Sequence, residues 1–331
     1  MTMSSPKRHS SKVAVISVAA DRLDGDTVPR VPQADFNNPD YATFAATIQP
    51  LVDLTRAFVA SAQNVMNSRA GLPEAESLMM DDIAHERPLV DAERNFDEPI
   101  ATVGMVSSLA LLAGQESVDA FARLIVHGPP PPVFTADILC RTAIDAVRTS
   151  WWLTEPGIPT AQRVKRVVAE LLYSADEMVR LKSDGDMQAL GTKRLAHLLE
   201  YSSERSWQIG GAEGRRSVDG ETRLTFRRFL EIHFGDAAAA HAVWAHLSAV
   251  THGSHHGLVQ SIDPTTTDQN VGVSGTSNMA IRNRLELAVN LVANATMQFL
   301  TYTGWRNSDV EAANDALVSE LDRLARIRVQ S

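Results

Sequence analysis

Apolar residues recur every three or four positions through most of this 331-residue chain. That spacing places them on one face of a helix. The strict alternation of apolar and polar residues that marks a half-buried strand is nearly absent. The sequence therefore predicts an all-α protein, a bundle of about eight to ten helices packed through aliphatic side chains. One exception is the turn pair Asp219-Gly220, which predicts a small hairpin near 215–225.

Proline, glycine and capping residues divide the chain into helical segments. Four consecutive prolines at 129–132 cannot continue a helix and predict a rigid boundary. We therefore expect a flexible lead-in at 1–38, a helical block at 39–128 and a main bundle at 133–331, with the two blocks free to pack as one domain. Within them, expected N-caps are Thr135, Thr160 and Asp236, and the long helix after 277 is expected to bury Ile281, Leu285, Ala288, Val289, Val292, Met297 and Leu300.

The composition of the chain restricts the cellular compartment and the binding partners that we expect for it. A single cysteine, Cys140, excludes an internal disulfide and fits a reducing cytoplasm. No apolar run reaches the ~20 residues that a membrane-spanning helix needs. The net charge of −9 argues against broad adhesion to nucleic acid or anionic membrane. Residues 141–230, however, carry 15 basic and 12 acidic side chains, so a local RNA contact through this basic segment stays open.

Histidines cluster strongly in one region. Six of the ten fall between 233 and 256, and Ser248 and His252 stand four residues apart on one helical face. His252 and His255, near the helix end, are candidates for general acid–base catalysis because the helix dipole raises a histidine pKa there. Packing or capping is the alternative for these side chains. We expect no metal, because neighbouring carboxylates lack any recognisable ligand spacing.

A second group of polar residues lies on the helix after the prolines. Arg141, Asp145, Arg148 and Trp152 share one face of an otherwise apolar helix, so they pair with one another or face a ligand. Two further arginines, Arg163 and Arg166, stand in the first turns of the next helix. They are candidates for contacting a phosphate of RNA, with a solvated basic face as the alternative.

The segments 135–182 and 240–260 resemble a group of uncharacterised bacterial helical proteins. The shared features are an Arg-x-x-x-acid helix, here Arg141 and Asp145, and a later Ser-x-x-x-His pair, here Ser248 and His252. The spacing Arg228-Phe-Leu-Glu-Ile-His233 resembles HEPN-like ribonucleases. Chance alone gives about two such pairs in a chain of this composition.

In helical character and length, the chain also resembles the valanimycin-type seryltransferases. That resemblance implies a cofactor-free enzyme that moves an aminoacyl group from a charged tRNA to a small amine or hydroxylamine. It implies His252 or His255 as the base, Ser248 as an orienting or nucleophilic hydroxyl and Arg141 as an electrostatic stabiliser. The alternatives are a metal-independent HEPN-like ribonuclease and a non-catalytic helical interaction module. The oligomeric state stays open, a homo-oligomer included.

Overall fold

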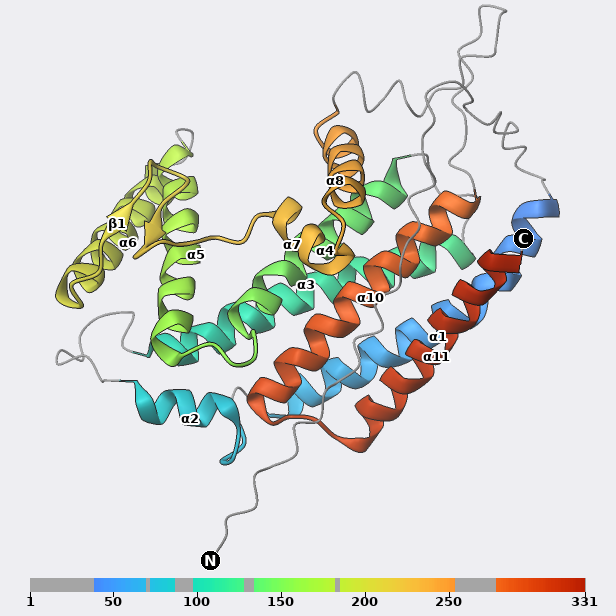
Figure 1. Ribbon diagram of the computed structural model, residues 1–331, viewed down its shortest axis with the longest axis horizontal. Helices are drawn as coiled ribbons and strands as arrows, with labels where there is room; N and C mark the ends of the chain where they lie inside the picture. The colour runs from blue at the N-terminus through green and yellow to red at the C-terminus, as the bar shows by residue number, and fades with distance from the viewer. Residues whose placement is uncertain are drawn as a thin grey trace, which may run out of the picture.

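The computed structural model describes residues 39–69, 72–86, 98–127, 134–181, 185–253 and 278–330. These contain ten helices and one small sheet, as Figure 1 shows. The expected all-α bundle and its short hairpin are confirmed. The helices are α1 (Pro39–Ser68), α2 (Leu78–His85), α3 (Pro99–His127), α4 (Thr135–Leu153), α5 (Thr160–Arg180), α6 (Gly185–Glu204), α7 (Phe226–Phe234), α8 (Ala237–Thr251), α10 (Asn278–Thr303) and α11 (Ser308–Gln330). None of them is long and apolar enough to cross a membrane.

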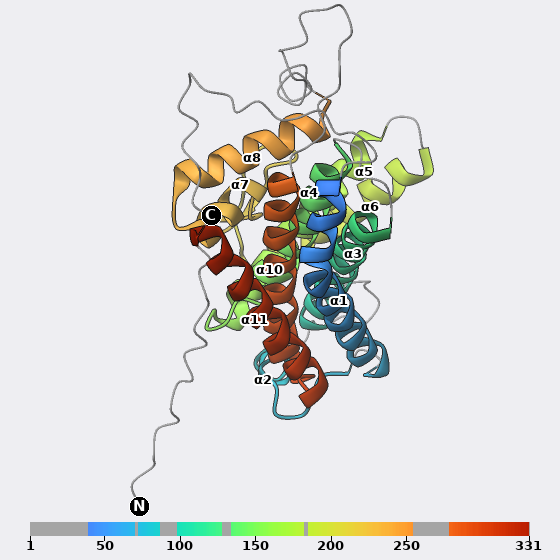
Figure 2. The same cartoon turned by 90° about the vertical axis from the view of Figure 1, so that its right-hand side faces the viewer.

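Three helices, α3, α4 and α10, pack together at the centre, and α1 and α11 lie side by side along this group (Figures 1 and 2). Helices from both sides of the proline segment therefore share one apolar core. Gly114 lets α3 approach α4 closely, because an added Cβ would overlap the Val147 side chain. The prolines at 129–132 lie outside the described residues.

The remaining elements form two attachments to this core. Helices α5 and α6 pack together and carry the sheet of β1 (Ile209–Gly210), β2 (Ser217–Val218) and β3 (Glu221–Thr222). The expected turn at Asp219 and Gly220 joins β2 to β3, with φ values of 48° and 85°. Helices α7 and α8 form the second attachment, a helical hairpin that rests on α4 (Figure 1).

Two of the expected N-caps differ from the structure by one residue. Asp236 caps α8 as predicted, accepting hydrogen bonds from the backbone N–H groups of Ala238 and Ala239. Thr135 and Thr160 are instead the first residues of α4 and α5, because Phe134 and Pro159 occupy the cap positions. Thr160 uses its hydroxyl to bond Asp82 on α2, at 2.5 Å. On α10, Met297 is only partly buried, while the other expected core residues are buried.

Candidate active site

A stripe of polar side chains runs along α4 where the α7–α8 hairpin rests on it. Asp137, Arg141 and Arg148 follow at helical spacing, and the apolar residues of α4 face the core. Arg148 is buried and satisfied, with its Nε 2.9 Å from Asp145 Oδ1 and its Nη1 donating to the carbonyl of Leu224. Asp145 is thus committed to Arg148, and its side chain is 42% exposed. Asp137 contacts α8 and α10, and Arg141 contacts the Phe226 ring on α7.

Asp137, His246 and Arg284 form a cluster where α4, α8 and α10 meet. His246 Nε2 lies 3.2 Å from Asp137 Oδ2 and 2.8 Å from Arg284 Nη2. Arg284 Nε also pairs with the other carboxylate oxygen of Asp137. The carboxylate is 2% exposed, while the imidazole is 30% exposed. A buried carboxylate therefore holds a histidine that solvent or a ligand can reach.

The protonation of His246 decides which partner its Nε2 uses. Arginine only donates hydrogen bonds and an ionised aspartate only accepts them. With its proton on Nδ1, neutral His246 accepts at Nε2 from Arg284. With its proton on Nε2, it donates to Asp137, and Arg284 Nη2 must move off that nitrogen because two donors cannot share a hydrogen bond. This form leaves Nδ1 as an acceptor, and no described residue hydrogen-bonds Nδ1. The second form is the one that can take a proton from a substrate.

Several buried polar atoms on the same helices lack a hydrogen-bond partner among the described residues. Buried polar atoms are normally paired, so such atoms need an explanation. Such atoms on α4, α8 and α10 include Arg141 Nη1, Ser248 Oγ, Asn283 Oδ1 and Arg284 Nη1. Arg284 belongs to the Asp137 cluster, and Arg141 stands one turn from Asp137 on α4.

The predicted Ser248–His252 pair does not form a side-chain contact in the described structure. His252 is the exposed C-cap of α8, and its backbone N–H donates to the Ser248 carbonyl at 3.0 Å. The hydroxyl of Ser248 is buried instead. His255 lies outside the described residues. Helix α8 packs on α4, the helix that carries Arg141, and the Arg141 guanidinium lies over the ring of Phe226 on α7.

Arg163 and Arg166, the expected phosphate contacts, lie inside the protein. Arg163 donates to Asp82 Oδ2 at 2.8 Å and to the carbonyls of Leu153 and Glu155. Together with Thr160 and Tyr302, which also bond Asp82, it fastens α2 to α5 and α10.

Arg166 pairs with Glu155 at 2.6 Å and Glu221 at 3.3 Å, and it packs over the ring of buried Trp152. We therefore assign Arg163, Arg166 and Trp152 to the fold.

The Arg-x-x-x-x-His spacing does not produce a joint site. Arg228 is exposed and pairs with Glu231 at 3.0 Å. His233 packs between the rings of Phe229 and Trp151, at 4.3 and 4.9 Å between centroids. Burial lowers the pKa of His233, so the imidazole is neutral near pH 7. This histidine is held as an aromatic packing residue.

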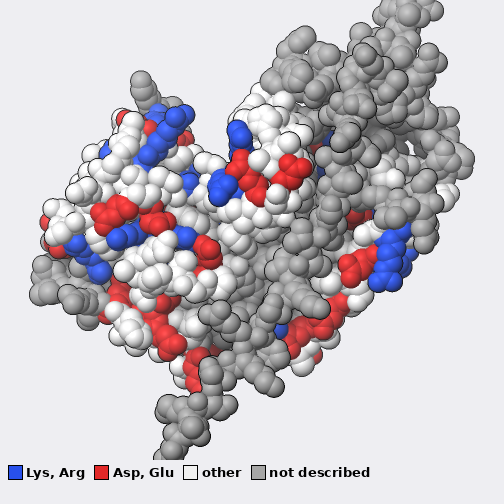
Figure 3. All heavy atoms as spheres, in the orientation of Figure 1, with Lys and Arg blue, Asp and Glu red and all other residues white. Residues whose placement is uncertain are grey.

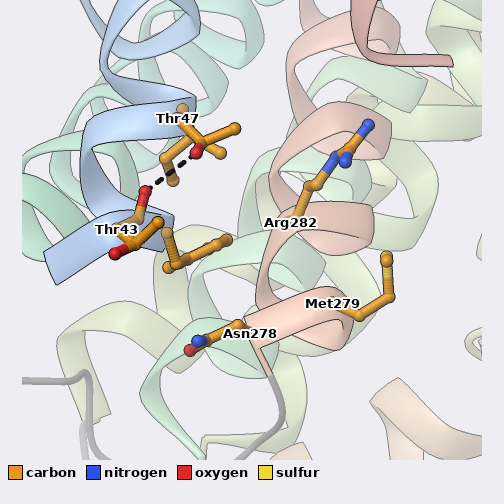
Figure 4. A pocket seen from close by; sticks show the side chains of 7 residues that line it. Thr43, Thr47, Asn278, Met279 and Arg282 are labelled. Carbon is orange, nitrogen blue, oxygen red and sulfur yellow. Dashed lines mark hydrogen bonds between the residues drawn. The ribbon is translucent and has the colours of Figure 1, made fainter. Parts of the chain in front are cut away.

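A groove between α1 and α10 is the described cavity that Figure 4 shows. Its volume is about 260 Å³, and its one charged lining residue is Arg282. That guanidinium already pairs with Glu286 at 2.6 Å and donates to the Leu324 carbonyl. The groove therefore offers little chemistry. It is lined by Thr43, Phe44, Thr47, Ile48, Asn278, Met279 and Arg282.

Sequence reasoning passed over all three cluster residues as individual candidates. Asp137 stands one turn before Arg141 on the same face, so extending the Arg141 stripe toward the N-terminus would have found it. His246 belongs to the histidine group, yet its spacing does not distinguish it from the other five. Arg284 carries no local signal, because its place beside Asp137 depends on how α10 packs against α4.

The described residues contain no group of three or more His, Cys, Asp and Glu side chains placed to hold a metal ion. No family model, curated protein or solved structure matches this chain.

Proposed function

We propose that this chain is an acyl transferase that uses His246 as its general base and needs no cofactor. Its acyl donor is an aminoacyl-tRNA, and its acceptor is a small amine or hydroxylamine. The observation that carries the proposal is the cluster of Asp137, His246 and Arg284. A base oriented by a buried carboxylate, with one nitrogen open, is the arrangement that proton abstraction requires.

The proposed reaction needs only groups that the cluster supplies. The acceptor nitrogen attacks the ester carbon, a C–N bond forms, and His246 Nδ1 takes the proton that nitrogen loses. The C–O bond to the tRNA then breaks, and the same proton passes to the leaving ribose oxygen. Asp137 stabilises the imidazolium in between, and Arg284 Nη1 stabilises the negative charge on the acyl oxygen. The base is thus His246 in place of His252 or His255.

Contact with tRNA has to come from a few exposed basic side chains. Figure 3 shows basic and acidic groups intermixed on the visible face, with no broad basic surface. Exposed Arg227 and Arg228 flank the start of α7, directly after Phe226, whose ring contacts Arg141. We assign the tRNA contact to these two arginines, since Arg163 and Arg166 are engaged inside the protein.

The test is transfer of labelled amino acids from a pool of charged tRNAs to hydroxylamine, with tRNA integrity followed in parallel. His246→Asn and Asp137→Asn should lower the transfer rate about 10²- to 10⁴-fold, the usual contribution of a positioned base. His85→Gln is the matched control, because His85 is exposed and bonds only the Asp81 carbonyl in the described structure.

Loss of transfer in His252→Ala together with full activity in His246→Asn would overturn the assignment of the base. No transfer from any charged tRNA by the wild-type protein would overturn the function. Cleavage of uncharged tRNA without metal would support the HEPN-like alternative instead.

A further inference from the structure

Half-buried Arg141 differs from the four buried arginines of the described chain. Each of those donates to both a carboxylate and a backbone carbonyl: Arg148, Arg163, Arg166 and Arg282. For the Arg141 guanidinium, the one interaction with a described residue is the Phe226 ring, 5.5 Å from its Cζ. Its Nη1 is buried and unpaired within the described chain.

The charges around Arg141 do not balance. Asp137, one turn away, is engaged by Arg284, and Asp145, one turn further on, is engaged by Arg148. Neither carboxylate forms an ion pair with Arg141, so its guanidinium has no counter-ion among the described residues. A partly buried positive charge without a counter-ion is unfavourable, and a bound anion would compensate it. This imbalance indicates an anionic ligand beside Arg141.

Arg141 stands one turn from Asp137 on the same face of α4, and Asp137 contacts His246. Ser248 Oγ on α8 and Asn283 Oδ1 on α10 are also buried without a partner among the described residues. A carboxylate bound by Arg141 would therefore lie about one helical turn from the proposed base.

We propose that Arg141 binds the carboxylate of the acceptor, so that the acceptor is an amino or hydroxyamino carboxylate. This inference rests on the proposed function for naming the acceptor. The carboxyl group of the aminoacyl donor is esterified to tRNA, so it is not a free anion. The free carboxylate must come from the other substrate. Arg141 fixes that carboxylate, and the acceptor's nitrogen reaches toward His246, whose partner Asp137 stands one turn from Arg141.

Binding is tested first, without any turnover. Glycine, sodium acetate and methylammonium chloride are added at equal ionic strength to the wild-type protein, Arg141→Met and Arg141→Lys. Glycine and acetate should raise the wild-type melting temperature by about 2–4 °C at tenfold excess over their dissociation constants, and methylammonium should not. Arg141→Met should lose the response and Arg141→Lys should weaken it. Arg306→Met, at an exposed ion pair with Glu311, is the control that keeps it.

An equal response in wild type and Arg141→Met, or an equal response to chloride, would overturn carboxylate binding. The side-chain Nε–H resonance of Arg141 gives a second reading in the wild-type protein, independent of whether the variants fold. It should move on titration with acetate, and a resonance that stays fixed contradicts the proposal.

Turnover then separates this inference from the proposed function. The wild-type protein should prefer N-hydroxyglycine to hydroxylamine about 10- to 100-fold in kcat/KM, the worth of one charged hydrogen bond, and Arg141→Met should lose that preference. Transfer without the preference overturns the inference and leaves the function standing. Carboxylate binding without transfer to either acceptor overturns the function and leaves the Arg141 site standing.

Discussion

At the scale of single residues, the buried arginines separate into two kinds. Arg163 is saturated by one carboxylate and two carbonyls, and removing it would leave Asp82 with a buried, poorly compensated charge. Arg141 has no carboxylate partner among the described residues, so replacing it leaves no carboxylate without its counter-ion. Residues selected for binding often lower stability in the empty protein, and the contrast between these two arginines fits that rule.

This contrast gives a prediction about stability. Arg163→Met should lower the free energy of unfolding by about 3–5 kcal/mol, whereas Arg141→Met should leave it unchanged or raise it by about 1 kcal/mol. Urea denaturation of both variants in carboxylate-free buffer measures the difference. A loss of several kcal/mol in Arg141→Met would show that Arg141 is a structural residue.

At the scale of elements, α8 contributes His246 to a junction whose other two residues lie on α4 and α10. It contains no Asp, Glu, Lys or Arg and packs on α7 and α4. Its N-terminus is fastened by Asp236, which accepts from Ala238 N–H at 2.8 Å. Gly235, with φ of 64°, makes the turn between α7 and α8 in a conformation that favours glycine.

Removing this cap should loosen α8. Asp236→Ala is expected to lower the free energy of unfolding by about 1 kcal/mol, because two backbone N–H groups lose their acceptor. Asp236→Asn should retain most of the stability, since an asparagine side chain also caps. Chemical denaturation of the two variants makes the comparison. Equal losses would contradict the capping role and indicate that the negative charge matters instead.

At the scale of the whole molecule, helices α2, α3 and the end of α6 meet around Glu86. Its carboxylate accepts from the Ile100 N–H at 3.2 Å and lies 3.6 Å from Arg205. Burial raises the pKa of Glu86 to about 7, and the Ile100 hydrogen bond and Arg205 partly oppose that rise. The folded protein therefore binds a proton at the Glu86 carboxylate more tightly than the unfolded chain does.

The raised pKa predicts how stability depends on pH. Protonated Glu86 adds to the free energy of unfolding. This contribution is fully present below about pH 4.5 and is lost as pH rises through 7, for a total on the order of 1–3 kcal/mol. Glu86→Gln should remove that part of the slope between pH 5 and pH 8 while keeping an acceptor for Ile100. Glu116→Gln, at an exposed position on α3, is the control. Parallel slopes in wild type and Glu86→Gln would contradict the prediction.

The limits of sequence reasoning follow from the range over which each interaction acts. Helix positions depend on neighbours three or four residues away, so the apolar stripes and the Asp236 cap could be predicted. The polar face of α4 was visible for the same reason. The sequence could not single out His246 among the six clustered histidines, because its contacts depend on how α8 lies across α4. Arg284 stands more than 140 residues from Asp137, and no periodicity connects them.

The way in which α8 is attached predicts which part of the molecule unfolds first on heating. Asp137 and Arg284 belong to the central group of helices, while His246 arrives on a hairpin that packs mainly on α4. Lifting that hairpin would separate His246 from Asp137 and leave the core folded. We therefore expect heating to abolish the proposed transfer activity at a lower temperature than the one that unfolds the central helices.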